Sequence, residues 1–506
     1  MKLFTNARAY AYDPASQTYT RSDALLVEGS KIVALGESEA GGGIERIDLV
    51  GATVLPAFAD CHVHLTDTGY FLGERNLNRT RTYTQFAAAV ERLPREPIIF
   101  AGQYDESFWT DGKVADAAPL DRAFPDALAM LVRVDGHSCL VNRKTLAWLN
   151  MPPDEAGIER TSSGDPTGKL FLAANWRAQA RFMEAIPQRV KRDAERRAAA
   201  LALAHGALHL HVQLVGFARD AYAQEIAALR DIAGPKWYPK ICEPDAGVAH
   251  ELGLPYVGGD VFLDGSIGSC TAAVSEPFLV GSGDRRPGLG DLKYADDELF
   301  AYFAQAHALG VSAGVHAIGD RAIEQCIATW ERVLVAQPAN GARHFIEHFE
   351  IARVDHIERC VQMGIYLSMQ PQFDQLWGGE GRMYDTRLGT QRMRSMNALG
   401  RAQRAGAVLC GGDDSPVCEL SPLQGMSAAV EHHEAQERLS APEALSMYTY
   451  NAARLGHAES STGRLAPGFD ADFVVLDRDP LDGASFAECT VGQTWSNGKC
   501  VYDATQ

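Results

Sequence analysis

Eight short apolar segments recur along the middle of the chain, and mostly helical segments separate them. The apolar segments have the length and composition of buried β-strands: FADCHVHL (58–65), LHLHVQLV (208–215), KWYPKIC (236–242), DVFLDG (260–265), VSAGVHAIG (311–319), RHFIEHF (343–349), GIYLSMQ (364–370) and AVLCGGD (407–413). Helices are expected at Asp193–Ala204, Ala295–Ala308, Arg321–Ala336 and Pro442–Leu455. This alternation predicts an α/β fold, a (β/α)8 or TIM barrel.

The two ends of the chain have a different pattern, typical of short strands joined by tight turns. Gly29-Ser30 lies between two apolar runs near the N-terminus, and Asn497-Gly498 lies between two more near the C-terminus. These patterns predict one small β-sandwich domain built from residues 1–55 and 460–506, beside a barrel over residues 56–459. A long stretch, residues 70 to 200, separates the first two barrel strands and is predicted to be an insertion over the barrel mouth.

Charge and cysteine usage narrow the class of partner. The chain of 506 residues carries 47 Lys and Arg against 65 Asp and Glu, a formal net charge of -18. This sign opposes binding to nucleic acid or to an anionic membrane, so a small-molecule substrate is expected. No apolar run is long enough for a transmembrane helix, and Met1–Ser16 does not resemble a signal peptide. Ten scattered cysteines without a CxxC pair favour a cytoplasmic location.

The first barrel strand carries a His-X-His pair, His62 and His64, near its end. Residues i and i+2 of a strand face the same way, so the two imidazoles can bind one metal ion. A second pair, His209 and His211, lies inside a strand that continues as Val212, Leu214 and Val215. We interpret the first pair as metal ligands and the second as structural.

Three further candidate ligands follow at strand ends in barrel order. His316 ends strand five, His348 ends strand six and Asp414 follows strand eight. Imidazole and carboxylate groups bind borderline divalent ions, and the C-terminal mouth of a barrel is where such side chains converge. The pattern predicts a divalent metal, Zn²⁺, with Asp414 also able to carry a proton.

Two charged residues near these motifs are expected to have no catalytic part. Lys169 lies in the segment PTGKL and is interpreted as a solvated turn residue. Glu347 precedes His348 and faces the opposite side of a regular strand, where Arg343 is its expected partner.

The order of motifs resembles the amidohydrolase superfamily, and within it the YtcJ-like amidohydrolase 3 family, which includes N-substituted formamide deformylase. The resemblance extends over nearly the whole chain. It rests on these segments: DCHVHL (from 60), RVDGHSCLVN (from 133), DPTGKL (from 165), FLDGSIGSCTAAVSEPF (from 262), VHAIGDRAI (from 315), RHFIEH (from 343), SMQPQF (from 368), GGDDSPV (from 411) and APGFDADFVVLDRDPL (from 466).

The resemblance implies roles for particular residues. The metal ligands implied are His62, His64, His316, His348 and Asp414, with Asp414 as the general acid/base. His137, in the motif Asp135-Gly136-His137, is the implied group that polarises the scissile carbonyl. The implied substrate-binding residues are Tyr104, Asp105, Asp135, Asp264 and Asp320, although Asp320 is equally expected to order its own loop. A homodimer is a family-level expectation, and the oligomeric state stays open.

One position departs from the family pattern. Relatives often have a lysine four residues before the Asp of the DGS motif, and in binuclear relatives this lysine is carbamylated and bridges two metals. Counting back from Asp264 gives Asp260. Three arrangements remain open: Asp260 bridges two ions, it binds one ion, or it lies beside a mononuclear centre. We expect Asp260 in or beside the metal site and leave one or two ions open.

Three functions are compatible with these motifs. The first is hydrolysis of a non-peptide C–N bond in an amide, N-acyl or formamide compound. The second is deamination of a cyclic amidine at a mononuclear centre. The third is a non-catalytic metal-binding protein on a hydrolase scaffold, which the full set of candidate ligands disfavours.

Overall fold

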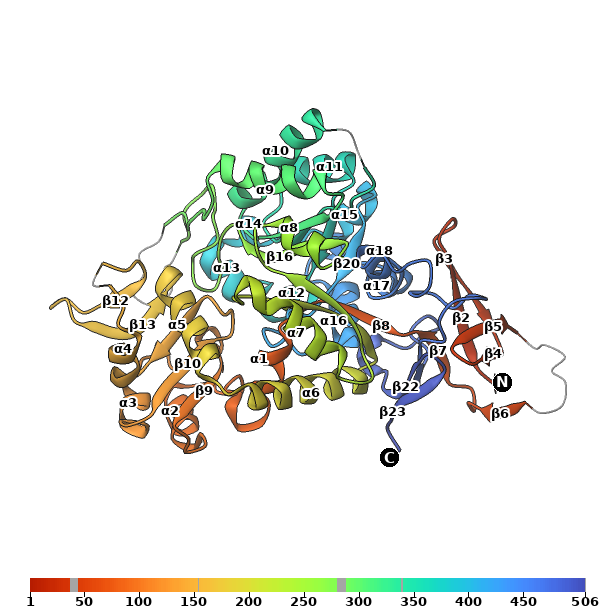
Figure 1. Ribbon diagram of the computed structural model, residues 1–506, viewed down its shortest axis with the longest axis horizontal. Helices are drawn as coiled ribbons and strands as arrows, with labels where there is room; N and C mark the ends of the chain where they lie inside the picture. Colours follow the sequence, from red (N-terminus) through yellow and green to blue (C-terminus); the bar gives the residue numbers. More distant parts are fainter. Residues whose placement is uncertain (37–43, 153, 280–287, 338–339, 506) are drawn as a thin grey trace.

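The computed structural model describes residues 1–36, 44–152, 154–279, 288–337 and 340–505. Figure 1 shows three regions along its long axis. The sheets built from the chain ends lie at one end, the segment between β8 (Phe58–Val63) and β14 (Ala207–Leu214) lies at the other, and the long parallel strands lie between them.

Eight parallel strands form the centre of the molecule, and they are the eight predicted from the sequence. A three-stranded sheet has the order β15-β14-β8, and a five-stranded sheet has the order β16-β17-β18-β19-β20, with every pairing parallel. Strand β15 also contacts β16, and β20 contacts β8. The strands are β8 (Phe58–Val63), β14 (Ala207–Leu214), β15 (Lys236–Ile241), β16 (Tyr256–Phe262), β17 (Ser312–Ala317), β18 (Phe345–His348), β19 (Tyr366–Met369) and β20 (Leu409–Gly411).

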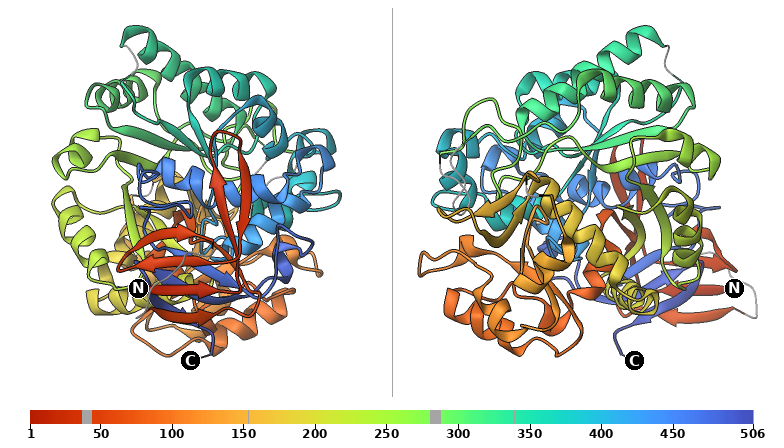
Figure 2. Two further views of the ribbon diagram at one scale, coloured as in Figure 1. Left: turned by 90° about the vertical axis from the view of Figure 1, so that its right-hand side faces the viewer. Right: turned by 60° about the vertical axis from the view of Figure 1, so that its left-hand side comes forward.

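Helices connect these strands, because parallel neighbours need a crossover between the end of one and the start of the next. They surround the strands in both views of Figure 2. The predicted helix over 442–455 is two helices, because Thr449 has non-helical angles of φ -134° and ψ -93°. The main helices are α6 (Gln188–Ala204), α7 (Tyr222–Arg230), α8 (Ala246–Glu251), α9 (Asp296–Ala308), α10 (Asp320–Ala336), α11 (Val354–Met363), α15 (Leu399–Ala405), α16 (Pro422–Glu431), α17 (Ala441–Met447) and α18 (Tyr450–Leu455).

The long segment between β8 and β14 has a sheet and a core of its own. Its five strands have the order β12-β13-β11-β10-β9 and pack against helices through separate apolar clusters. The strands are β9 (Ile98–Tyr104), β10 (Leu128–Arg133), β11 (Ser138–Val141), β12 (Ile158–Arg160) and β13 (Pro166–Phe171). The helices are α1 (Leu65–Tyr70), α2 (Tyr83–Arg92), α3 (Ala118–Ala123), α4 (Arg143–Leu149) and α5 (Leu172–Ala185).

The chain ends meet in two sheets that share one apolar cluster. Phe4 of the first sheet lies 5.1 Å from Phe473 and 4.9 Å from Trp495 of the second, measured between ring centroids. Both predicted hairpin turns are confirmed, since β4 pairs antiparallel with β5 and β22 with β23. The first sheet contains β5 (Lys31–Leu35), β4 (Leu25–Glu28), β1 (Lys2–Thr5) and β6 (Glu45–Asp48). The second contains β23 (Lys499–Asp503), β22 (Val491–Ser496), β21 (Phe473–Leu476), β7 (Thr53–Pro56), β2 (Arg8–Asp13) and β3 (Thr18–Ser22).

In the part of the chain that the structure describes, no helix is both long enough and apolar enough to cross a membrane.

Candidate metal centre

Three imidazoles and two carboxylates converge where the central strands end. His62 lies on β8 and His64 directly follows it; Asp260 lies on β16, His348 ends β18, and Asp414 follows β20. The ligand atoms of His62, Asp260 and His348 all lie within 4.8 Å of one another, as do those of His62, His64 and Asp414. Parallel strands place their carboxyl ends at the same edge, so residues distant in sequence meet here.

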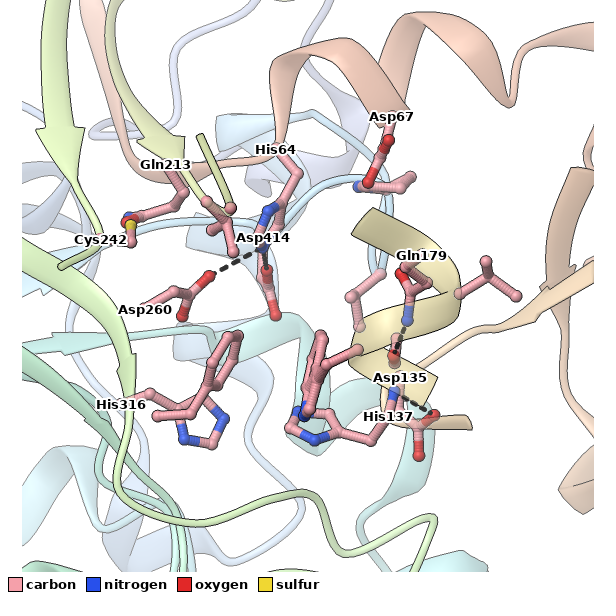
Figure 3. Close-up of a pocket in the computed structure, with 18 of the residues that line it drawn as sticks. His64, Asp67, Asp135, His137, Gln179, Gln213, Cys242, Asp260, His316 and Asp414 are labelled. Carbon is pink, nitrogen blue, oxygen red and sulfur yellow. Dashed lines mark hydrogen bonds and ion pairs between the residues drawn. The ribbon is translucent and has the colours of Figure 1, made fainter. Parts of the chain in front are cut away.

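Both carboxylates face the first histidine pair. The Nε2 atom of His64 is 3.1 Å from Asp260 Oδ2 and 3.1 Å from Asp414 Oδ1. The Nε2 atom of His62 is 3.3 Å from Asp260 and 3.4 Å from Asp414. The Nε2 atom of His348 is 3.9 Å from Asp260 Oδ1. Figure 3 shows Asp260 and Asp414 side by side under the His64 ring.

Local backbone geometry turns two of these side chains. His348 has a φ of 72° and Asp414 a φ of 51°, both in the left-handed region that non-glycine residues rarely adopt. Such angles persist where the surrounding structure enforces them, and they cluster at functional sites. Here the backbone changes direction at His348, where β18 ends, and again at Asp414, after the end of β20.

The electrostatics of the cluster favour a bound cation. Burial lowers the pKa of His64, but the hydrogen bonds to Asp260 and Asp414 outweigh burial and raise that pKa to about 10. Burial raises the pKa of Asp260, but His62 and His348 hold it well below its usual range. Asp260 Oδ1 and Asp414 Oδ1 are buried and face imidazole nitrogens at 3.9 Å and 3.1 Å. The two carboxylates therefore favour positive charge in the cluster. Imidazole and carboxylate groups are a donor set that suits Zn²⁺ or a similar divalent ion, which would bind the imidazoles in their neutral form.

Behind His62 lies an ion pair that the sequence did not predict. Glu347 Oε2 is 3.0 Å from His62 Nδ1, and Lys240 Nζ donates to Glu347 Oε1 at 2.6 Å and to the Cys61 carbonyl at 2.9 Å. The expected pairing of Glu347 with Arg343 is wrong, because Arg343 pairs with Glu459 instead. The signal for Lys240 was a lysine inside the predicted strand 236–242, between Pro239 and Ile241.

These outer contacts orient the imidazoles. Glu347 faces the Nδ1 atom of His62, which leaves Nε2 directed at Asp260 and Asp414. In the same way His348 Nδ1 lies 2.9 Å from Gln370 Oε1, which leaves Nε2 on the side of Asp260. Partners of this kind set the tautomer and raise the affinity of metal-binding histidines.

His316 lies beside the cluster but outside both groups of close ligand atoms found among the described residues. Its ring centroid is 4.5 Å from that of His348, and its Nδ1 is 3.2 Å from Asp264 Oδ1. Asp264 is fully buried and accepts backbone N–H groups from Ala273, Ile318 and Gly319. It therefore orders the loops and the His316 ring, and it does not line the pocket as a substrate-binding residue would.

A cavity of about 780 Å³ opens over the cluster, between the strand ends and the inserted segment. The predicted substrate-binding residue Asp135 and the predicted catalytic residue His137 both line it. Burial, with His316 and Lys293 nearby, lowers the pKa of His137 to about 3, so its imidazole is neutral at neutral pH. In Figure 3, His137 and His316 lie on the same side of the cavity, below the two carboxylates.

The other predicted substrate residues lie elsewhere. Tyr104 is fully buried, with its ring 5.3 Å from that of Phe86. Asp105 is buried and accepts the indole N–H of Trp377 at 2.9 Å. Asp320 accepts the backbone N–H of Ser275 at 2.8 Å, outside the cavity, which matches the loop-ordering alternative.

A buried arginine, also missed from sequence, holds the pocket loop of the insertion. Arg133 donates to Asp105 at 3.1 Å, to Glu106 at 2.9 Å and to Asp135 at 2.9 Å. Asp135 in turn accepts the hydroxyl groups of Ser266 and Ser269 and the backbone N–H of His137, so this network ties the insertion to the loop after β16.

The prediction that Lys169 is a solvated turn residue is wrong. Lys169 lies on β13 and is 3% exposed, with Nζ 4.0 Å from Glu106 Oε1. A short motif that resembles a turn can extend a strand when the neighbouring sheet covers it, and here β11 pairs with Lys169 directly.

Comparisons with known proteins agree with this fold and site. The chain is similar to the crystal structure of an uncharacterized metal-dependent hydrolase from Pyrococcus furiosus, with a TM-score of 0.72 and 26% identity over 95% of this chain and 100% of that one. The fold is therefore that of a metal-dependent hydrolase. The model of the amidohydrolase family matches residues 45–502, and the chain belongs to that family.

Two relatives refine this placement. The chain is 30% identical over 530 residues to YtcJ of Bacillus subtilis (strain 168), which is named as an amidohydrolase, with 96% of each chain covered. It is 25% identical over 528 residues to the N-substituted formamide deformylase of Arthrobacter pascens, covering 96% of this chain and 95% of that protein. The predicted resemblance is confirmed.

Proposed function

We propose that this protein hydrolyses non-peptide C–N bonds of the amide, N-acyl or formamide type at a divalent metal centre. The observation that carries the proposal is the arrangement of His62, His64 and His348 around Asp260 and Asp414, at the floor of a cavity large enough for a small molecule. The similarity to a formamide deformylase supports this bond type.

The five converging residues would hold the ion, which we propose to be Zn²⁺. A bound divalent ion would polarise the substrate carbonyl and lower the pKa of water to about 7. His316 lies beside the cluster. It would either contact the ligands of the first ion or bind a second ion itself. The number of ions depends on whether Asp260 bridges two of them, as the carbamylated lysine of binuclear relatives does at that position.

The side chains have separate tasks in the proposed reaction. Asp414 faces His64 and lines the cavity, so its carboxylate takes the proton of the attacking water and passes it to the leaving amine. His137 is neutral and faces the cavity from the insertion, so its ring N–H donates to the developing oxyanion. Asp135 positions His137 through the backbone N–H of that residue.

The test measures metal per chain and turnover for the parent, Asp260→Ala and Asp414→Asn. Two equivalents falling towards one in Asp260→Ala would identify Asp260 as a bridge. One equivalent in both would indicate a mononuclear centre and raise the second candidate function, deamination of a cyclic amidine. That candidate is favoured by Asp260 standing where relatives often have a lysine, and ammonia release from a ring compound without amide cleavage would establish it.

We expect Asp414→Asn to lower kcat on an amide substrate by a factor of about 100 or more, because it removes the general acid/base. Near-normal turnover of this variant with metal still bound would contradict the mechanism. Absence of metal-dependent turnover on amides, carbamates, lactones and cyclic amidines alike would favour a non-catalytic metal-binding protein.

We infer further that the two central sheets are the predicted (β/α)8 barrel, and that the sheets of residues 1–55 and 460–506 form the predicted β-sandwich domain. The barrel inference rests on the contacts of β15 with β16 and of β20 with β8. No disulfide bond joins any of the ten cysteines, all of which lie among the described residues, and this supports the proposal of a reducing, cytoplasmic location.

A further inference from the structure

One lysine of the cavity wall, Lys293, forms no ion pair with any of the described residues. Lys293 lies in the segment before α9 and lines the cavity, and its backbone N–H donates to the carbonyl of Leu263 at 2.9 Å. Two buried cations differ from it, because Arg133 contacts three carboxylates and Lys240 contacts Glu347.

Aromatic rings hold the Lys293 ammonium in place. Its Nζ lies 4.9 Å from the ring centroid of Trp176 and 4.9 Å from that of Phe262. These two rings stack on each other with centroids 4.6 Å apart and planes 24° apart. A cation over aromatic faces is stabilised without being neutralised, so its charge remains available to an anion.

The aromatic pair places this charge next to the proposed reaction site. The Phe262 ring is 4.9 Å from His316, and the Trp176 ring is 5.2 Å from His137. A small molecule whose carbonyl lies between His137 and the metal cluster therefore extends towards Lys293.

The charge state fits this role. Burial lowers the pKa of Lys293 to about 8, against the opposing effect of Asp264, Asp260 and Asp291, so the ammonium form predominates at neutral pH. Lys293 is exposed towards the cavity, so an anionic group of a ligand bound there can form a charge-assisted hydrogen bond with its ammonium group.

We propose that Lys293 binds a carboxylate of the substrate, so that this protein prefers amides that carry a carboxylate group. This inference rests on the proposed function of the same site. The stacked rings of Trp176 and Phe262 would pack against the carbon chain between the amide and the carboxylate.

The experiment compares release of formate from two probes of nearly the same size, the anionic N-formylglycine and the neutral N-formylglycinamide. We expect the parent to have the higher kcat/KM for the carboxylate. Lys293→Met should reduce that preference at least about tenfold, the effect of one charge-assisted hydrogen bond. Lys293→Arg should retain most of it.

Lys191 on α6 offers a matched control, because it also lines the cavity but faces Glu225, Glu195 and Glu184. Lys191→Met should keep the carboxylate preference of the parent. An unchanged preference in Lys293→Met, or an equal loss for both probes, would overturn the inference. So would a preference lost in Lys191→Met and retained in Lys293→Met.

A binding measurement separates this inference from the proposed function. Calorimetry with N-(methylsulfonyl)glycine, an analogue that lacks the scissile carbonyl, and with its neutral carboxamide needs no turnover. If no amide is hydrolysed, the proposed function is contradicted. Tighter binding of the acid than of the carboxamide, lost in Lys293→Met, would still support the carboxylate site. Equal binding of acid and carboxamide by the parent would overturn it.

Discussion

Two His-X-His pairs lie on neighbouring parallel strands, and their contacts with carboxylates differ. Each imidazole of the first pair, His62 and His64, lies within 3.4 Å of both Asp260 and Asp414. On β14, by contrast, His209 lies 3.2 Å from the Tyr238 hydroxyl, 3.1 Å from Thr462 and 3.6 Å from one carboxylate, that of Asp472. His211 stacks on Tyr238 with ring centroids 4.7 Å apart.

The difference is one of depth along the strand. Strand β8 ends at Val63, so His64 is already at the open edge. Strand β14 pairs His209 with Ala59 and runs on to Leu214, so its own histidines lie deeper and Gln213 reaches the cavity instead. The same short motif therefore either reaches the proposed metal site or packs within the sheet, according to where its strand ends.

Removing one histidine from each pair gives the largest expected contrast. His64→Ala deletes a donor that faces both carboxylates, so we expect most of the bound metal and at least about 100-fold of the turnover to be lost. His211→Ala should keep the metal content of the parent. Metal analysis of the two purified variants checks this, and equal loss in both would remove the distinction between the pairs.

Glu347→Gln tests whether the contact that orients His62 is part of what distinguishes the first histidine pair from the second. The amide can no longer pair with Lys240 or fix the imidazole as a carboxylate does, so metal affinity should fall by about 10- to 100-fold. Competition with a chelator measures that affinity. Glu459→Gln, which removes the carboxylate that pairs with Arg343, is the matched control and should leave metal affinity unchanged.

The smallest effects are expected within the second pair. His209→Ala leaves Tyr238 and Thr462 without a partner, so the free energy of unfolding should fall by about 1–3 kcal/mol. His211→Leu should change it by less than about 1 kcal/mol, because His211 Nδ1 has no hydrogen-bond partner among the described residues. Denaturant titration measures both, and a larger loss in His211→Leu would reverse the order.

The central strands, and the residues that lie at their ends, were predictable because the hydrophobic pattern that marks a strand is local. Each of the eight strands, both hairpin turns and the placing of His62, His64, His348 and Asp414 at strand ends follow from runs of a few residues. The break at Thr449 was not predictable, because the apolar spacing continues through it while the backbone turns.

The outer contacts of the site were less accessible to sequence reasoning. Lys240, Glu347 and Arg133 are charged residues inside apolar segments, and each has its partner on another element. Glu347 was assigned to the wrong side because a regular strand was assumed, whereas His348 has a φ of 72°.

The sequence by itself determined the elements, their order and the residue types at the strand ends, because these depend on short-range periodicity and on the chemistry of imidazole and carboxylate groups. Only the tertiary structure decided which of those residues meet. Asp260 lies against His62 and His64, Asp264 and Asp320 make loop contacts, and Lys293 has no carboxylate partner in the part of the chain that the structure describes. Such outcomes depend on distances between elements far apart in the chain, and no local pattern encodes them.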